Sequence, residues 1–287
     1  MKKEIVMRTR ILTALVALCV LIPVLIFSHT WLFSIAVVAC CLIALWEAFK
    51  CIGVKNLWVT VPTYLVAAFL ILSFRFFREK YAFGTDAFIV RIAVPCIFLA
   101  ALYLTGVMVF SLGKLSVESL STAGFLSFYI ISAFLCILFL RATDRGAYTY
   151  LLIFIGAWIT DIFAYFIGML FGKHKLIPEI SPKKTIEGSI GGILFCGGSF
   201  ILYGVLIGHF FENAERMNLA VLFAYGVIVS VVSQIGDLSM SAVKRHYGIK
   251  DFGKIFPGHG GILDRFDSIL AVSLALFVLN EFAHVFH

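Results

Sequence analysis

Nine long apolar runs follow one another along the chain, separated by short polar or glycine-containing links. They fall at about 10–28, 30–49, 57–74, 88–111, 122–140, 147–171, 188–209, 217–239 and 264–286. A helix needs roughly 20 apolar residues to cross a bilayer, and only helices or closed barrels satisfy their backbone there. Barrel strands alternate over about ten residues, which these continuous runs do not. The pattern therefore predicts an all-α, polytopic membrane bundle of nine transmembrane helices, divided most narrowly at 28–30 and kinked at Pro23, Pro62 and Pro95.

Composition supports a membrane protein. The chain of 287 residues is 62% hydrophobic and 14% charged, whereas soluble domains are about 45–50% apolar and about 25% charged. This balance excludes a water-soluble enzyme, a disordered protein and a secreted disulfide scaffold. The seven cysteines form no CxxC pair and lie mostly inside apolar runs, which favours buried hydrophobic side chains over disulfides or zinc ligands.

Basic residues predict the orientation. With the N-terminus in the cytoplasm, the cytoplasmic links hold 15 lysines and arginines and the opposite side holds 7, with Arg265 at a span mouth. This asymmetry follows the positive-inside rule, so links 172–187 and 240–263 are expected in the cytoplasm. The net charge of +7 is thereby explained by topology, and no nucleic acid is expected as a partner.

The two halves of the chain differ in polarity. Residues 1–146 carry few polar groups inside their spans and are predicted to be a scaffold, open to oligomer or lipid contacts. Residues 147–287 hold nearly all the carboxylates at membrane depth, and intramembrane carboxylates are costly and usually functional. Glu47, in the first half, is interpreted with Lys50 as a surface pair at the end of a span. Chemistry is therefore expected in the second half.

Three aspartates are predicted to meet at one cytoplasmic mouth. Asp264 and Asp267 are three apart, so they share a face where the last span begins, and Asp237 closes the preceding span. Carboxylate oxygens suit Mg²⁺ or Mn²⁺, and nearby cations would suit a nucleotide triphosphate. The basic residues around them are Lys244, Arg245, Lys250, Lys254, His259 and Arg265. The alternative is a positive-inside loop whose aspartates simply pair with these cations.

The segment 241–267, called the signature segment below, resembles a known family. It matches Ser-x-Val-Lys-Arg-x₄-Lys-Asp-x-Gly-x₂-Phe-Pro-x-His-Gly-Gly-Ile-x-Asp-Arg-Phe-Asp, the pattern of phosphatidate cytidylyltransferases, or CDP-diacylglycerol synthases. Upstream, Asp161-x₂-Ala-Tyr-x₂-Gly-x₃-Gly-Lys173 and Ser181-Pro-Lys-Lys-Thr-x-Glu-Gly188 are similar to a second block of that family. The resemblance covers about 150–287, and the first half matches only in hydropathy.

The resemblance implies a reaction of CTP with phosphatidate in the bilayer, giving CDP-diacylglycerol and pyrophosphate. It implies Mg²⁺ on Asp237, Asp264 and Asp267, with a second cation (K⁺ or another divalent ion) as an option. Lys250, His259 and Arg265 would join the three aspartates in catalysis. Substrate contacts are assigned to Asp161, Lys173, Lys183, Lys184, Ser241, Lys244 and Arg245. The enzyme would lie in the inner membrane with its active site facing the cytoplasm, and a homodimer is left open.

Other interpretations remain at this stage. A CDP-alcohol phosphotransferase also joins carboxylates and Mg²⁺, but its Asp-Gly-x₂-Ala-Arg pattern does not occur in the chain. A cation-coupled transporter would show inverted repeats and broken helices. Asp161 could make a structural hydrogen bond, and Lys183 and Lys184 could act only in topology. Gly168-x₃-Gly172 is more typical of close helix packing than of a phosphate loop.

Overall fold

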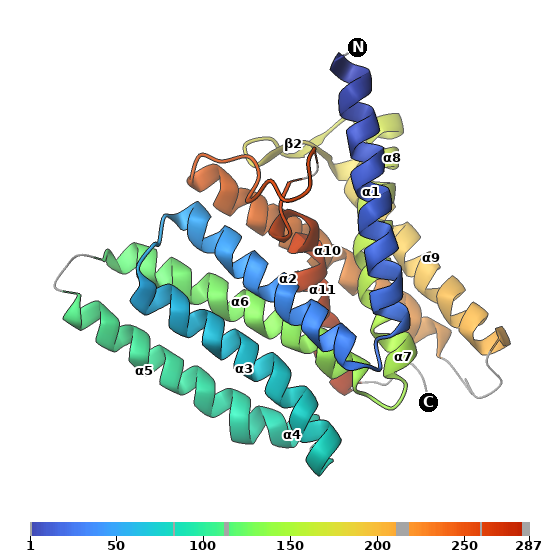
Figure 1. Ribbon diagram of the computed structural model, residues 1–287. Helices are drawn as coiled ribbons and strands as arrows, with labels where there is room; N and C mark the ends of the chain where they lie inside the picture. Colours follow the sequence, from blue (N-terminus) through green and yellow to red (C-terminus); the bar gives the residue numbers. More distant parts are fainter. Residues whose placement is uncertain (1, 83, 112–114, 211–217, 259, 283–287) are drawn as a thin grey trace. The chain divides into compact units, whose positions relative to one another are not determined.

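The computed structural model describes residues 2–82, 84–111, 115–210, 218–258 and 260–282. Within these ranges it contains nine long helices (Figure 1), one for each predicted apolar run. They are α1 (Lys2–Ile26), α2 (Trp31–Ile52), α3 (Leu57–Tyr81), α5 (Val94–Phe110), α6 (Val117–Arg141), α8 (Leu151–Phe171), α9 (Ile186–Phe210), α10 (Leu219–His246) and α11 (Leu263–Phe282). Shorter elements are α4 (Thr85–Phe88), the π-helical turn η1 (Ile89–Ala93) and α7 (Gly146–Thr149). The all-α prediction and the division between the first two helices are confirmed.

Seven segments in the described ranges are long and apolar enough to cross a membrane. They are Trp31–Ile52, Leu57–Tyr81, Thr85–Phe110, Val117–Arg141, Gly146–Phe171, Ile186–Phe210 and Leu219–His246. In α1 the apolar part is the shorter stretch Leu15–Ile26. Helix α11 begins with Asp264, Arg265 and Asp267, which lower its hydropathy. A multi-pass membrane protein is therefore confirmed, whereas crossings by α1 and α11 and the direction of every span remain predictions.

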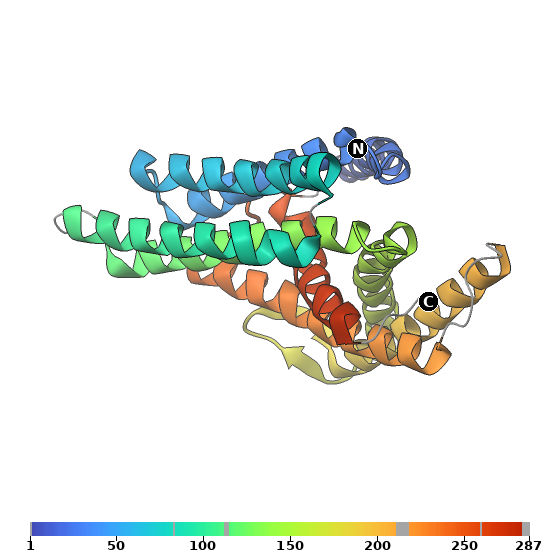
Figure 2. The same cartoon turned by 90° about the horizontal axis from the view of Figure 1, so that it is seen from below.

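The chain forms two compact units. The first contains the residues up to Leu138 together with Tyr247–Arg265, and the second contains Phe139–His246 together with the chain from Phe266 onward. In the first unit, α2 packs on α3 and α3 on α5, and these helices run alongside one another in Figures 1 and 2. Aromatic side chains join these helices: Phe49 of α2 lies against Tyr64 of α3 with ring centroids 5.8 Å apart, and the buried Phe74 of α3 lies 5.1 Å from Phe88 of α4.

Two prolines in the first unit each remove one backbone hydrogen bond from a helix, and the local structure compensates for each loss. Proline has no N–H and crowds the carbonyl four residues earlier. At Pro62 that carbonyl belongs to Trp58, and the Tyr103 hydroxyl of α5 donates to it at 2.8 Å. At Pro95 the preceding residues Ile89–Ala93 form the π turn, which widens the helix where the regular bond is lost. Both helices therefore continue through their prolines.

The second unit is built around α8, α9 and α10, which pack on one another. Glycines allow this close approach. A methyl group added at Gly226 of α10 would lie 2.7 Å from the Gly197 Cα of α9. The buried hydroxyls of Thr160 and Ser230 form a hydrogen bond of 2.9 Å between α8 and α10. Small residues at helix interfaces are characteristic of packing in membranes, where close backbone contact supplies much of the attraction.

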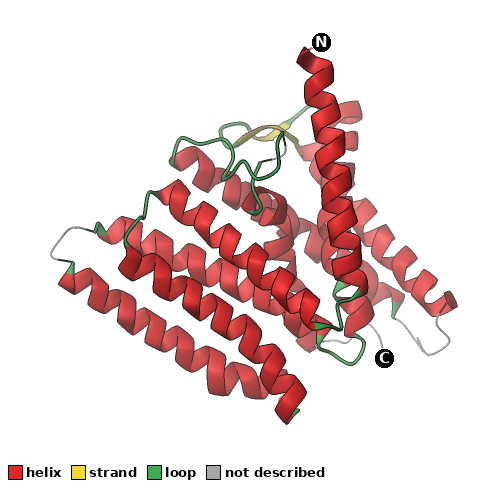
Figure 3. Ribbon diagram, in the orientation of Figure 1, coloured by secondary structure: helices red, strands yellow, loops and turns green. Residues whose placement is uncertain are grey.

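A small β-hairpin connects α8 and α9, where the sequence predicted only a link. Strands β1 (Lys175–Ile177) and β2 (Ser181–Thr185) are antiparallel, with Lys175 opposite Thr185 and Ile177 opposite Ser181. The two strands are the yellow arrows in Figure 3. The second predicted link, 240–263, is also partly regular, because α10 continues to His246. Asp237 therefore lies inside α10 rather than closing it.

Candidate active site

In the first unit, the loop between Asp251 and Leu263 folds around the carboxylate of Asp264. Its Oδ2 atom accepts hydrogen bonds from the backbone N–H groups of Phe252 at 2.8 Å, Gly253 at 3.4 Å and Gly261 at 2.9 Å. Phe256 and Gly260 also exchange backbone hydrogen bonds of 2.9 and 3.1 Å. Gly260 has a φ of 92°, a left-handed conformation that glycine adopts without strain. Asp264 thus organises the loop that precedes it.

Glu47 of α2 contacts the same part of the signature segment. Its side chain is fully buried, Oε1 accepts from Ile262 N–H at 3.1 Å, and Oε2 accepts from Leu263 N–H at 2.8 Å. The interpretation of Glu47 as a surface pair with Lys50 is therefore wrong. The sequence did contain an indication of burial, because Glu47 is a carboxylate within an otherwise apolar span. Burying a carboxylate in a span is costly unless it has hydrogen-bond partners.

The second unit gathers four charged side chains of the predicted site. Lys184 Nζ on β2 lies 2.5 Å from Asp237 Oδ2 on α10. Asp267 on α11 is buried, and it interacts electrostatically with Asp237, Lys244 and Asp161. Lys244, in the last turn of α10, is also buried. Two carboxylates and two ammonium groups are therefore placed together by α10, α11 and the hairpin.

The predicted metal site would use the carboxylates of this cluster. Among the residues that the structure describes, no three or more His, Cys, Asp or Glu side chains form a group able to hold a metal ion. The donor chemistry of Asp237 and Asp267 nevertheless fits Mg²⁺, which prefers one or two carboxylates together with substrate phosphates and water. The ammonium group of Lys184 against Asp237 shows that this position attracts a cation. Asp264 lies in the first unit, where its Oδ2 binds the loop.

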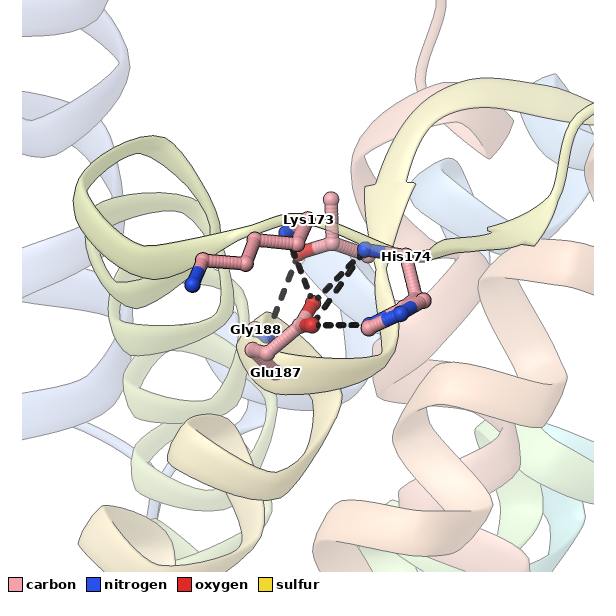
Figure 4. Close-up of polar contacts among 5 residues, drawn as sticks. Lys173, His174, Glu187 and Gly188 are labelled. Atoms are coloured by element: carbon pink, nitrogen blue, oxygen red, sulfur yellow. Dashed lines mark hydrogen bonds and ion pairs between the residues drawn. The ribbon is translucent and has the colours of Figure 1, made fainter.

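The hairpin is attached to the start of α9 through Glu187 (Figure 4). The Glu187 carboxylate accepts hydrogen bonds from the backbone N–H groups of Lys173 at 3.1 Å and His174 at 3.2 Å, and it lies 2.7 Å from His174 Nδ1. Thr185 Oγ1 accepts from the N–H of Gly188 at 3.1 Å. These contacts fix both ends of the hairpin that carries Lys183 and Lys184.

Close packing explains the two glycines that precede the hairpin. A methyl group at Gly168 would lie 2.7 Å from Thr185 Oγ1, and one at Gly172 would lie 2.7 Å from Thr185 Cγ2. A methyl group at Gly188 of α9 would also lie 3.0 Å from the Gly168 Cα, so the predicted helix packing is confirmed at Gly168, whereas Gly172 packs on the hairpin. Lys173 contributes its backbone to the Glu187 contact, and its side chain is exposed.

Comparison of the sequence with known proteins shows the family of this chain. The family model described as the cytidylyltransferase family matches residues 8–283. The chain belongs to the cytidylyltransferase family. A phosphatidate cytidylyltransferase of Staphylococcus haemolyticus is 35% identical over 95% of this chain and 98% of its own, as is one of Staphylococcus aureus. One of Staphylococcus epidermidis is 46% identical over 49% of this chain and 52% of its own.

The family match extends the resemblance that the sequence indicated. The motifs predicted a match over about 150–287, with only hydropathy in the first half, whereas the cytidylyltransferase model begins at residue 8. The match therefore includes the N-terminal helices from residue 8 onward. Glu47 lies in this region and contacts the signature segment.

The remaining predicted residues of this cytidylyltransferase differ in exposure. Ser241 is buried in α10, and Asp161 is exposed on α8. Lys183, Arg245, Lys250 and Arg265 are exposed. His259 lies outside the described residues. Each of the described groups thus lies on a defined helix, strand or loop.

Proposed function

We propose that this chain transfers the cytidylyl group of CTP to phosphatidate, giving CDP-diacylglycerol and pyrophosphate. The observation that carries the proposal is the identity of 35% over 95% of the chain to proteins named phosphatidate cytidylyltransferase. The local geometry supports it, because lysines of the hairpin and α10 stand beside the carboxylates Asp237 and Asp267. A multi-pass membrane protein also gives access to both a lipid and a water-soluble nucleotide.

The reaction is an in-line displacement at the α-phosphorus of CTP. A phosphatidate oxygen forms the new P–O bond, the bond between the α-phosphorus and the bridging oxygen breaks, and pyrophosphate leaves with that electron pair. A phosphomonoester has its second pKa near 6, so the attacking phosphate is largely ionised near neutral pH. A dedicated general base is not required, and catalysis consists of positioning and charge neutralisation.

The side chains divide into anion-binding and metal-binding groups. We assign Lys244, Arg245 and Lys250 mainly to the CTP phosphates, and Lys183 and Lys184 to the phosphatidate phosphate. Asp237 and Asp267 would hold Mg²⁺, with Asp264 added on the family resemblance. When bound, Mg²⁺ supplies positive charge that offsets the charge developing on the triphosphate. Asp161, Lys173, Ser241, His259 and Arg265 are proposed to complete the substrate and catalytic contacts.

The structure modifies one of these assignments. Because Lys184 pairs with Asp237, it can bind the lipid phosphate only when that ion pair is exchanged. A cation on Asp237 would release Lys184 for this purpose, so metal and lipid binding are expected to support each other. The proposed location is the inner membrane with the site on the cytoplasmic side, where CTP is present. Residues 147–287 are proposed to supply most of this chemistry, and a homodimer remains compatible with it.

Pyrophosphate release by the purified chain in detergent tests the activity. Release is expected only when CTP and phosphatidate are both present, to stop after chelation by EDTA and to return with Mg²⁺. Turnover without phosphatidate would contradict the proposed reaction. Full activity after thorough chelation would contradict the metal site while leaving the reaction in place. No specific observation favours the phosphotransferase or the transporter as a second candidate.

A further inference from the structure

The N-terminus of α11 is bound by a side chain that lies more than 200 residues earlier in the sequence. Oε1 of Glu47 accepts from Ile262 N–H and Oε2 accepts from Leu263 N–H, at 3.1 and 2.8 Å. The separations in sequence are 215 and 216 residues. Both groups belong to the first unit, in which α2 and Tyr247–Arg265 are packed together. The contact therefore connects a helix of the predicted scaffold to the signature segment.

The physical reason for this contact lies in the start of α11. The first N–H groups of a helix have no partner within the helix, and its N-terminus favours negative charge. A residue just before the helix usually supplies the acceptor, but here Gly260, Gly261 and Ile262 offer no side-chain oxygen. Glu47 supplies the acceptor oxygens instead. Burying a carboxylate is expensive without such donors, so the two hydrogen bonds also explain why Glu47 can be fully buried.

Two glycines of the signature segment leave the space that Glu47 occupies. A methyl group at Gly253 or at Gly261 would overlap the Glu47 carboxylate. Neither glycine has a positive φ, so backbone conformation does not require glycine there. The requirement comes from the approach of α2. Together, Glu47 and Asp264 accept five hydrogen bonds from the backbone between Phe252 and Leu263.

We propose that Glu47 is a positioning residue for the transfer reaction, acting through the backbone of residues 252–263. By fixing this loop and the start of α11, it holds Lys250, Asp264 and Arg265 in the arrangement that the reaction needs. Glu47 itself touches neither substrate. The inference deepens the proposed function and rests on it, and it gives the N-terminal helices a part in positioning the site rather than a scaffolding part alone.

Substitution of Glu47 by Gln gives the first test. Gln keeps the size and one acceptor oxygen, but its NH₂ group meets a backbone N–H that then lacks an acceptor. Because one charge-assisted hydrogen bond is lost, we expect kcat to fall about tenfold or more. The KM for phosphatidate should change less than about threefold, since Lys183 and Lys184 lie on the hairpin, which Glu47 does not contact. The matched control is Glu79→Gln, which removes the exposed carboxylate of an i, i+4 pair with the half-buried Arg75 in the same unit.

Hydrogen–deuterium exchange of the full-length protein provides a readout that does not depend on activity. In Glu47→Gln, peptides covering 252–263 should exchange faster than in the wild type. The hairpin 175–185, which Glu187 holds, serves as the internal reference and should keep its exchange rate. Unchanged exchange in 252–263 together with a wild-type kcat would overturn the proposal. A loss seen only as less folded protein, with kcat per folded molecule unchanged, would assign Glu47 a structural role and also overturn it.

A double substitution tests the contact between Glu47 and Gly261 directly. Gly261→Ala alone should lower kcat and speed exchange in 252–263, because its methyl group displaces the Glu47 carboxylate. In the Glu47→Ala background the same change should cost less than about twofold, because the space is already vacated. If the effects of Gly261→Ala and Glu47→Ala on kcat were additive, the proposed contact between Glu47 and Gly261 would be contradicted. If the wild type released no pyrophosphate from CTP and phosphatidate, the proposed function would fail, while the exchange data would still decide the contact.

Discussion

Four carboxylates of this chain, those of Glu47, Asp237, Asp264 and Asp267, serve two different purposes. Glu47 and Asp264 receive backbone N–H groups and thereby shape the signature segment. Asp237 and Asp267 instead lie beside ammonium groups, those of Lys184 and Lys244. The first pair acts on the conformation of the protein, and the second pair has the surroundings that a metal ion and a triphosphate would use.

Replacement of Asp267 or Asp237 by Asn is expected to lower kcat by about 10² or more, because a preorganised charge interaction in such a site is worth several kcal/mol. The measurement is pyrophosphate release per folded protein. Asp144→Asn, in an exposed turn of the same unit, is the matched control and should retain wild-type rate. A variant of Asp267 or Asp237 with more than about a tenth of that rate would exclude its residue as a metal ligand.

Lysine substitutions separate the nucleotide contacts from the lipid contacts. Lys250→Ala should raise KM for CTP more than KM for phosphatidate, and Lys184→Ala should do the reverse. Loss of one charge-assisted hydrogen bond costs about 1.5–3 kcal/mol, or roughly 10 to 150-fold in kcat/KM. Lys175→Ala, exposed on the neighbouring strand, controls for loss of charge in the hairpin. Equal KM shifts for both substrates in both variants would defeat this division.

At the residue scale, the sequence predicts which chemical groups matter better than it predicts their partners. Spacing places Asp264 and Asp267 on one face of α11, but it does not reveal that Asp264 Oδ2 binds three N–H groups of the preceding loop. The prediction of a surface ion pair for Glu47 is wrong because its sequence neighbour Lys50 offered a nearby cationic partner. Its true partners lie over 200 residues away, and local spacing carries no information about such contacts.

At the scale of elements, apolar length is sufficient to locate the nine long helices within the described part of the chain. It was insufficient for the hairpin, because β1 and β2 span only three and five residues and β2 reads Ser-Pro-Lys-Lys-Thr. Such polar strands show no apolar alternation. Their conformation depends on Glu187 and on pairing with each other, which are tertiary contacts. The C-terminal extension of α10 to His246 was also missed, because its last turns are basic and amphipathic rather than apolar.

The packing of α9 against α10 leads to a prediction about glycines. Gly226→Ala should destabilise the protein by about 1–3 kcal/mol, because the methyl group would meet the backbone of Gly197 and Cys196. Gly198→Ala on the exposed face of α9 has no atom within 4 Å of its added methyl group and should cause no destabilisation. Thermal unfolding in the same detergent compares the two. Equal behaviour of the variants would contradict the close packing of these helices.

At the scale of the whole molecule, large apolar side chains cover the surface. Phe110 is 83% exposed and Phe98 is 71% exposed on α5, which has no buried residue. Exposed apolar surface of this extent needs lipid or another protein against it. Lipid around the seven candidate spans would cover this apolar surface. The distribution of lysine and arginine then predicts which ends of the spans lie in the cytoplasm.

Cysteine accessibility tests that orientation. In a cysteine-free background, a cysteine at Lys175 should resist an impermeant thiol reagent in intact spheroplasts and react after lysis. A cysteine at Asp144, in the link between α6 and α8, should react in both conditions. Both positions are exposed in the structure, so burial does not account for a difference. The opposite pattern would invert the topology and separate the proposed site from the cytoplasmic CTP.

The central claim is that the α-phosphorus of CTP becomes attached to phosphatidate. The most direct measurement follows CTP radiolabelled at either the α- or the γ-phosphate, with the purified protein, Mg²⁺ and phosphatidate. We predict that the α label moves into a lipid identified by mass spectrometry as CDP-diacylglycerol, while an equal amount of γ label appears in pyrophosphate. An α label that stays in water-soluble products as pyrophosphate forms, or a γ label found in lipid, would contradict the account.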